Sequence, residues 1–250
     1  MQPYFTLVRR ELGSYFVSLS GYVIIASVAF LLGLSFTQLL QALANHPLDV
    51  PLNEVFFDTQ YFWLILILAA PVITMRTFAQ EKATGTYETL MTVPVGDLTV
   101  VLAKFTGALI FYLLVWLPLV ACFFLVRHYA TEAWAFDPAV LASTFLGIFL
   151  IGCVYLAMGC YASSLTSSHA VAAMVSLALG IGLYLVGFRA LDETATLTLA
   201  QRVLMHVSMI QHLGDFSRGI VDSRWVVFYV SLTIFFLFLT LKSVESRRWK

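Results

Sequence analysis

Six long stretches of the chain are predominantly apolar and have no charged residue in their central parts. A helix needs about 20 apolar residues to cross a bilayer, whereas a barrel strand alternates over about ten. The continuous runs therefore predict six transmembrane helices and not a β-barrel. The predicted helices cover residues 21–40, 62–75, 105–126, 140–161, 170–188 and 225–241, and the second is expected to begin a turn earlier, near residue 56.

The segment before the first apolar stretch has the pattern of an amphipathic helix, with apolar residues at helical spacing and charged residues on another face. The apolar positions are Phe5, Val8, Leu12, Tyr15 and Phe16, and the charged ones are Arg9, Arg10 and Glu11. We expect residues 1–20 to lie in the inner membrane interface. The arginines would then contact a partner protein, or simply anchor the segment to lipid phosphates.

The distribution of cations gives an orientation. Nine of the 14 Lys and Arg residues fall on one predicted side, and the positive-inside rule places this side, with both termini, in the cytoplasm. The nine are Arg9, Arg10, Arg76, Lys82, Lys104, Lys242, Arg247, Arg248 and Lys250. An alternative is that residues 1–44 form a signal peptide ending at Ala42-Leu43-Ala44, but the apolar run is longer than signal peptides use.

Composition excludes several classes of protein. Hydrophobic residues make up 60% of the 250 residues and charged residues 11%, far from the balance of a soluble domain. The net charge of zero gives no basic field for nucleic acid. The three cysteines lie inside apolar runs, which indicates neither a disulfide framework nor a zinc site.

The segment 76–104 is far longer than a turn between two helices needs, and it contains Glu81, Gly85, Thr86, Glu88 and Leu90. Thr86 is expected to cap a short helix after Gly85, and Pro94 to Asp97 should break the chain before the third span. A short helix of mixed polarity between two spans suits docking to a cytoplasmic partner. An ordinary solvated loop is the alternative.

Two further regions carry weaker signals. Ala172, Ser176 and Gly180 recur every four residues, which favours close helix packing over a substrate-lining role. The segment 189–224 is predicted to form an external covering or re-entrant helix pair. Its His206, His212 and Asp215 match no established metal site by spacing, so we expect solvated or interfacial histidines.

No motif for catalysis stands out. None of the four lysines has the Gly-Lys-Ser/Thr context of a phosphate-binding loop, and no metalloprotease or nucleophile-elbow motif occurs. The uncharged centres of the six stretches disfavour an ion-coupled carrier. These features indicate a transport subunit driven by another protein's chemistry. The alternatives are a self-sufficient channel or secondary transporter, or an intramembrane enzyme.

The stretch 71–107, PVITMRTFAQEKATGTYETLMTVPVGDLTVVLAKFTG, resembles the first cytoplasmic loop of type-2 ABC exporter permeases, the ABC-2 family. The matching positions are Glu81, Gly85, Thr86, Glu88, Leu90, Pro94 and Lys104. The segments RRELGSYF, SRGIVDSRWVVFYVSL and ESRRWK further resemble the gliding-motility and copper-processing (nitrous-oxide-reductase maturation) branch of that family.

The resemblance implies an all-α polytopic fold with a single permease domain over residues 1–250, in the cytoplasmic membrane of a bacterium. The chain would have no catalytic residue, metal or cofactor of its own, because P-loop ATPase partners would bind ATP and Mg. A second permease unit, identical or related, would complete the transporter, with membrane lipid around it and no nucleic acid. The implied ATPase-coupling residues are Glu81, Gly85, Thr86, Glu88, Leu90, Arg9 and Arg10.

Overall fold

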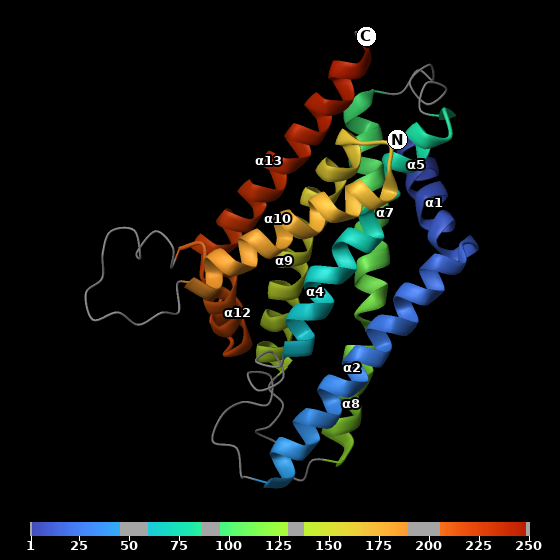
Figure 1. Ribbon diagram of the computed structural model, residues 1–250. Coiled ribbons are helices and arrows are strands. Elements are labelled where there is room, and N and C mark those ends of the chain that lie inside the picture. The colour runs from blue at the N-terminus through green and yellow to red at the C-terminus, as the bar shows by residue number, and fades with distance from the viewer. Residues whose placement is uncertain (1, 46–59, 87–95, 130–137, 190–205, 249–250) are drawn as a thin grey trace.

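The computed structural model describes residues 2–45, 60–86, 96–129, 138–189 and 206–248, and within these ranges the chain is helical without strands (Figure 1). In chain order the helices are α1 (Gln2–Val17), α2 (Leu19–Asn45), α4 (Gln60–Thr74), α5 (Ala79–Ala83), α7 (Asp97–Val115), α8 (Leu117–Tyr129), α9 (Pro138–Leu165), α10 (His169–Arg189), α12 (Met209–Ser217) and α13 (Ser223–Arg248). The two ends of the chain lie at the same end of the bundle.

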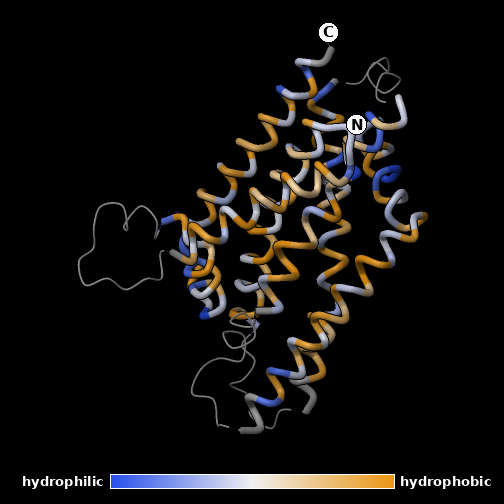
Figure 2. Tube along the Cα trace, viewed as in Figure 1, coloured by the Kyte–Doolittle hydropathy of each residue, from blue (hydrophilic) through white to orange (hydrophobic). Residues whose placement is uncertain are grey.

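Six segments of the described chain are long and apolar enough to cross a membrane, which confirms the six predicted helices. Figure 2 shows apolar residues along most of the length of these helices. The spans are Leu19–Gln41, Tyr61–Ala83, Asp97–Leu125, Pro138–Leu165, His169–Phe188 and Ser223–Ser246.

The third span begins earlier than its apolar run. Helix α7 starts at Asp97 after an extended Gly96, eight residues before the predicted start at residue 105. Of the break expected at residues 94–97, Gly96 is extended, Asp97 already belongs to α7, and Pro94 and Val95 lie outside the described residues. Residues 97–104 are helical and do not belong to a loop. The apolar window missed them because they include the charged side chains of Asp97 and Lys104. The span then bends at Trp116, just before Pro118 in the first turn of α8.

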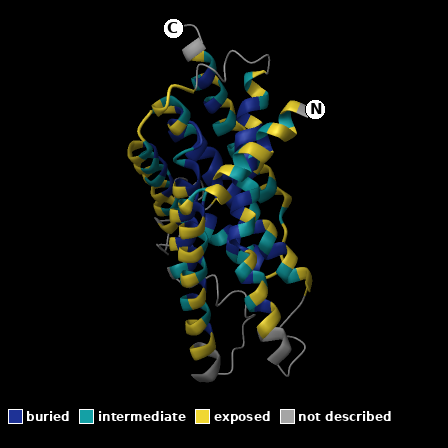
Figure 3. Cartoon of the chain, turned by 90° about the vertical axis from the view of Figure 1, so that its right-hand side faces the viewer, coloured by how far each residue is buried: buried dark blue, intermediate teal, exposed yellow. Residues whose placement is uncertain are grey.

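Helix α9 forms the centre of the bundle and contacts α4, α7, α10, α12 and α13. Glycines on α9 allow this close approach. A Cβ atom at Gly159 would lie 2.0 Å from Thr74 Oγ1 of α4, and one at Gly152 would lie 2.3 Å from the Tyr112 ring of α7. Figure 3 shows the buried residues inside the bundle and the exposed ones along its outer helices.

Helix α1 packs along α7, and the predicted helix in residues 1–20 is confirmed over Gln2–Val17. Val8 and Tyr15 are buried, and the Tyr15 ring stacks on Phe111 with centroids 4.5 Å apart. Phe5, by contrast, is 65% exposed. The prediction that Glu11 lies on a separate polar face is wrong, because its side chain is turned inward toward a buried cation on α7 and is only 12% exposed.

Helix α12, within the segment 189–224, packs against α9 and α10. His212 is fully buried, stacks on Trp225 at 3.7 Å between centroids, and its Nδ1 lies 3.0 Å from Tyr229 Oη. The predicted solvated or interfacial setting is therefore wrong for His212, whereas His206 is exposed. The reason is helical spacing: His212 shares the buried face of α12 with Met209, Leu213 and Phe216. Burial, with a smaller effect of His206, lowers the pKa of His212 to about 4.

Candidate functional site

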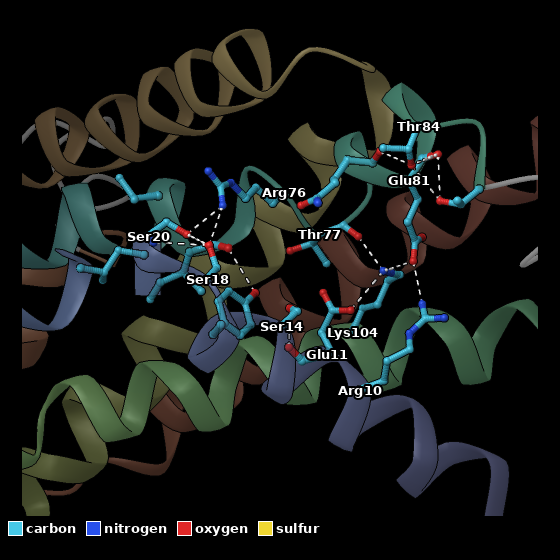
Figure 4. Close-up of a pocket in the computed structure, with 16 residues that line it drawn as sticks. Arg10, Glu11, Ser14, Ser18, Ser20, Arg76, Thr77, Glu81, Thr84 and Lys104 are labelled. Carbon is cyan, nitrogen blue, oxygen red and sulfur yellow. Dashed lines mark hydrogen bonds and ion pairs between the residues drawn. The ribbon is translucent and has the colours of Figure 1, made fainter. Parts of the chain in front are cut away.

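Four charged side chains from three helices meet at the end of the bundle that holds the termini (Figure 4). Glu81 Oε1 on α5 lies 2.8 Å from Arg10 Nη2 on α1 and 2.9 Å from Lys104 Nζ on α7. Lys104 Nζ also lies 3.3 Å from Glu11 Oε2 on α1. We call Arg10, Glu11, Glu81 and Lys104 the ion-pair cluster. It joins the start of the chain to the end of the second span and the start of the third.

Burial makes this cluster different from an ordinary surface ion pair. The Lys104 side chain is only 5% exposed and that of Glu81 15%, while Arg10 at the rim is 56% exposed. Lys104 Nζ donates in addition to Thr77 O at 2.6 Å, so each of its three N–H groups has an acceptor. A buried charge is tolerated only when it is paired and hydrogen-bonded in this way.

Glu11 is the second carboxylate of the cluster and pairs with Lys104. Desolvation by burial raises the pKa of Glu11, although the charge of Lys104 acts to lower it, and the Glu81 carboxylate raises it further. Lys104 Nζ lies farther from Glu11 Oε2, at 3.3 Å, than from Glu81 Oε1, at 2.9 Å. Among the described residues Glu81 Oε1 pairs with two cations, and Glu11 Oε2 pairs with one. Glu81 is therefore the carboxylate that holds the two cations together.

The short helix α5 is also fixed to the central helix α9. Ser163 Oγ accepts hydrogen bonds from the backbone N–H groups of Phe78 and Ala79, each at 3.0 Å, and so satisfies two donors at the start of α5. Lys82 Nζ donates to the carbonyl oxygen of Ser164. Helix α5 is thus bound to α1, α7 and α9 together, and a displacement of α5 must act on all three.

A pocket of about 400 Å³ opens beside the cluster. Arg10, Glu11, Glu81 and Lys104 line one side of it, and Arg76 lies on the other side near Ser18 and Ser20 (Figure 4).

The structure brings together only part of the predicted ATPase-coupling set. Glu81 and Arg10 lie in the cluster, Arg9 is exposed on α1, and Gly85 has a left-handed φ of 71° that favours glycine. Thr86 is exposed, and its Oγ1 lies 2.9 Å from Thr84 Oγ1. Glu88 and Leu90 lie outside the described residues, as does the body of the short helix predicted after Thr86.

The three predicted packing residues lie on the inner side of α10. Ala172 and Ser176 are buried. A Cβ atom at Gly180 would lie 2.9 Å from the Tyr155 ring of α9, and Tyr155 Oη donates to Gly180 O at 3.1 Å. Their packing role stays a prediction.

Sequence reasoning missed Glu11 and Ser163 as members of this site. The position of Glu11 in the sequence could have indicated its role. An acid beside two arginines on an otherwise amphipathic helix can turn inward if it pairs with a buried cation. Ser163 had none, because its role depends on the contact between α9 and α5, which are more than 80 residues apart.

Comparison with known proteins gives one family. The family model described as ABC-2 family transporter protein matches residues 14–241, a range that includes Glu81 and Lys104 but begins after Arg10 and Glu11. It does not distinguish a branch within that family. No curated protein matches the chain.

Proposed function

The chain belongs to the ABC-2 family of transporter proteins, and from that premise we propose that it is the membrane-spanning permease subunit of an ATP-binding-cassette exporter. A separate P-loop ATPase subunit binds and hydrolyses ATP with Mg, and this chain contributes no catalytic residue. A second permease unit, identical or related, completes the pathway.

The observation that supports this proposal most strongly is the buried ion-pair cluster. A transporter driven from outside needs a stiff connection between the surface that the ATPase contacts and the helices that move. Glu81 provides such a connection, because it binds α5 to Lys104 on α7 and to Arg10 on α1. Closure of the ATPase would thus move α5 and several spans together, as in rigid-body transitions of packed helices.

Charge distribution supports a cytoplasmic position for this end. The cluster lies at the end that holds both termini, where the positive-inside rule places the cytoplasm. Thr84, Gly85 and Thr86, which follow the end of α5, are exposed and so are accessible to an ATPase bound at this end.

The test compares two charge reversals at this end of the protein. Glu88→Lys replaces an acid in the predicted docking segment, and the matched control Glu245→Lys replaces an exposed acid near the end of α13. Each variant is expressed in its native host and purified in mild detergent, and the bound ATPase and its activity in nanodiscs are measured. We expect Glu88→Lys to lose the bound ATPase or its control by the permease, while Glu245→Lys behaves like the wild type.

Two results would contradict the proposal. One is an unchanged complex and unchanged ATPase activity in Glu88→Lys, which would remove the coupling role of the segment. The other is solute flux through liposomes that contain this chain alone without nucleotide, which would indicate a channel or secondary transporter.

A further inference from the structure

Arg76 differs from the cations of the ion-pair cluster. It follows α4 and is half-buried, and its Nη1 donates to Ser18 Oγ at 3.1 Å and to Ser20 Oγ at 2.7 Å. A guanidinium has five N–H donors, and the three on Nη2 and Nε have no partner among the described residues. Arg10 and Lys104 both pair with Glu81, whereas Arg76 has no carboxylate partner in the described part of the chain.

The surroundings of Arg76 are polar on one side and apolar on the other. It lines the pocket of about 400 Å³ together with Ser18 and Ser20 from the junction of α1 and α2. Ile24 of α2 and Val72 of α4, which belong to membrane spans, form apolar parts of the same lining. A free anion would gain nothing from the apolar walls, whereas a molecule with an anionic group and a hydrocarbon part would match both.

The outer surface beside the pocket is also apolar. Val17 and Leu19 flank Ser18 and are 89% and 79% exposed, and Tyr22 and Val23 are exposed in the first turns of α2. These residues lie where an interfacial helix turns into a membrane span, so lipid is the molecule that covers them. The pocket therefore opens at the depth of lipid headgroups.

We propose that Arg76, with Ser18 and Ser20, binds the phosphate of a membrane glycerophospholipid. The planar fork of a guanidinium matches two phosphate oxygens, and the serine hydroxyls that hold Nη1 keep the remaining donors in place. The glycerol and first acyl carbons lie against Ile24 and Val72. Basic pockets between transmembrane helices bind lipid headgroups in this manner.

Such a lipid would connect two parts of the chain. Ser18 and Ser20 belong to the α1–α2 junction, and Arg76 follows α4, so a bound phosphate strengthens the contact between them. A ligand that binds only the folded protein raises its thermal stability. The site rests on the membrane spans and on the pocket, and it does not depend on the proposed ATPase partner.

The experiment measures lipid binding to the full-length chain after delipidation in detergent. Dioleoyl phosphatidylglycerol is titrated in, and bound lipid is counted by native mass spectrometry. We expect Arg76→Gln to weaken the tightest binding event at least about tenfold, as loss of a charge-assisted hydrogen bond does. The matched control Arg224→Gln removes an exposed arginine at the start of α13 and should bind the lipid like the wild type.

Further measurements identify the ligand and show whether the variants are folded. Arg76→Lys keeps the charge but loses the fork, so it should bind with intermediate affinity while eluting as a monodisperse species. Inorganic phosphate at millimolar concentration should not displace the lipid, and displacement would overturn the lipid assignment. Equal lipid binding by Arg76→Gln and the wild type would also overturn it.

Discussion

Replacement of Lys104 by methionine tests whether the ion-pair cluster holds this end of the bundle together. Methionine fills a similar volume without charge, so the change removes the cation and leaves Glu11 and Glu81 facing each other. Removal of one partner from a buried pair costs about 3–5 kcal/mol, because the other charge is left uncompensated. Two features place Lys104→Met near the lower limit: Glu81 keeps Arg10, and Glu11 can take up a proton.

The expected loss is therefore about 3 kcal/mol, which corresponds to about 6–12 °C in Tm for a chain of this size. Intrinsic fluorescence of the purified protein during heating measures it. The matched control is Lys242→Met, whose partner Glu245 lies at 2.7 Å, closer than either acid lies to Lys104. That pair is exposed, with Lys242 57% accessible, so its loss should cost at most about 1 kcal/mol.

The pH dependence of the stability of the wild type and of Lys104→Met supplies a second test of the ion-pair cluster. Burial raises the pKa of Glu11 above its ordinary value, so the folded protein retains a proton that the unfolded chain releases. Stability linked to Glu11 is therefore greatest at low pH and falls as pH rises through its folded-state pKa. Without Lys104 this fall should steepen, and the deficit of Lys104→Met should be smaller at pH 5 than at pH 8. Equal Tm losses for the two lysine variants would contradict this expectation, because the burial of Lys104 would then add nothing to the strength of its ion pairs.

Three further predictions concern other parts of the bundle. Gly159→Ala should lower stability by about 1–3 kcal/mol, since its Cβ meets Thr74 Oγ1, whereas Gly182→Ala has open space around it and should be neutral in the same thermal assay. Ser163→Ala should cost about 1–3 kcal/mol and increase hydrogen exchange at the start of α5, where two amides lose their acceptor. The contribution of His212 to stability should be lost as pH drops from about 6.5 toward 4, because the unfolded chain protonates His212 and the folded one does not, so the stability of His212→Phe relative to the wild type should rise over this range.

The six spans were predictable because each depends on a local property, an apolar run of sufficient length. The ends of the spans were less predictable. Helix α7 extends to Asp97 since Lys104, which interrupts the apolar run, finds two carboxylates and a carbonyl once α1 and α5 pack beside it. A hydropathy window treats Lys104 as an unfavourable residue for a membrane span, because Glu11, Glu81 and Thr77, which pair with it, lie outside the window.

The candidate site could be predicted only in part for the same reason. The Glu81 segment was recognisable from its residues, but the pairing of Glu81 with Arg10 and Lys104 joins positions 71 and 23 residues away along the chain. His212 shows a different limit. Its burial follows from the apolar face of a nine-residue helix, a pattern too short to separate from a solvated segment without its neighbours.

The most direct test of the account is the composition of the native complex. The tagged chain is extracted from its own membrane in mild detergent, and the intact assembly is weighed by native mass spectrometry. We expect a P-loop ATPase in equal copy number with the permease units, and loss of that ATPase in Glu88→Lys but not in Glu245→Lys. Recovery of the chain without any ATPase, in a form that still moves solute across liposomes without nucleotide, would contradict it.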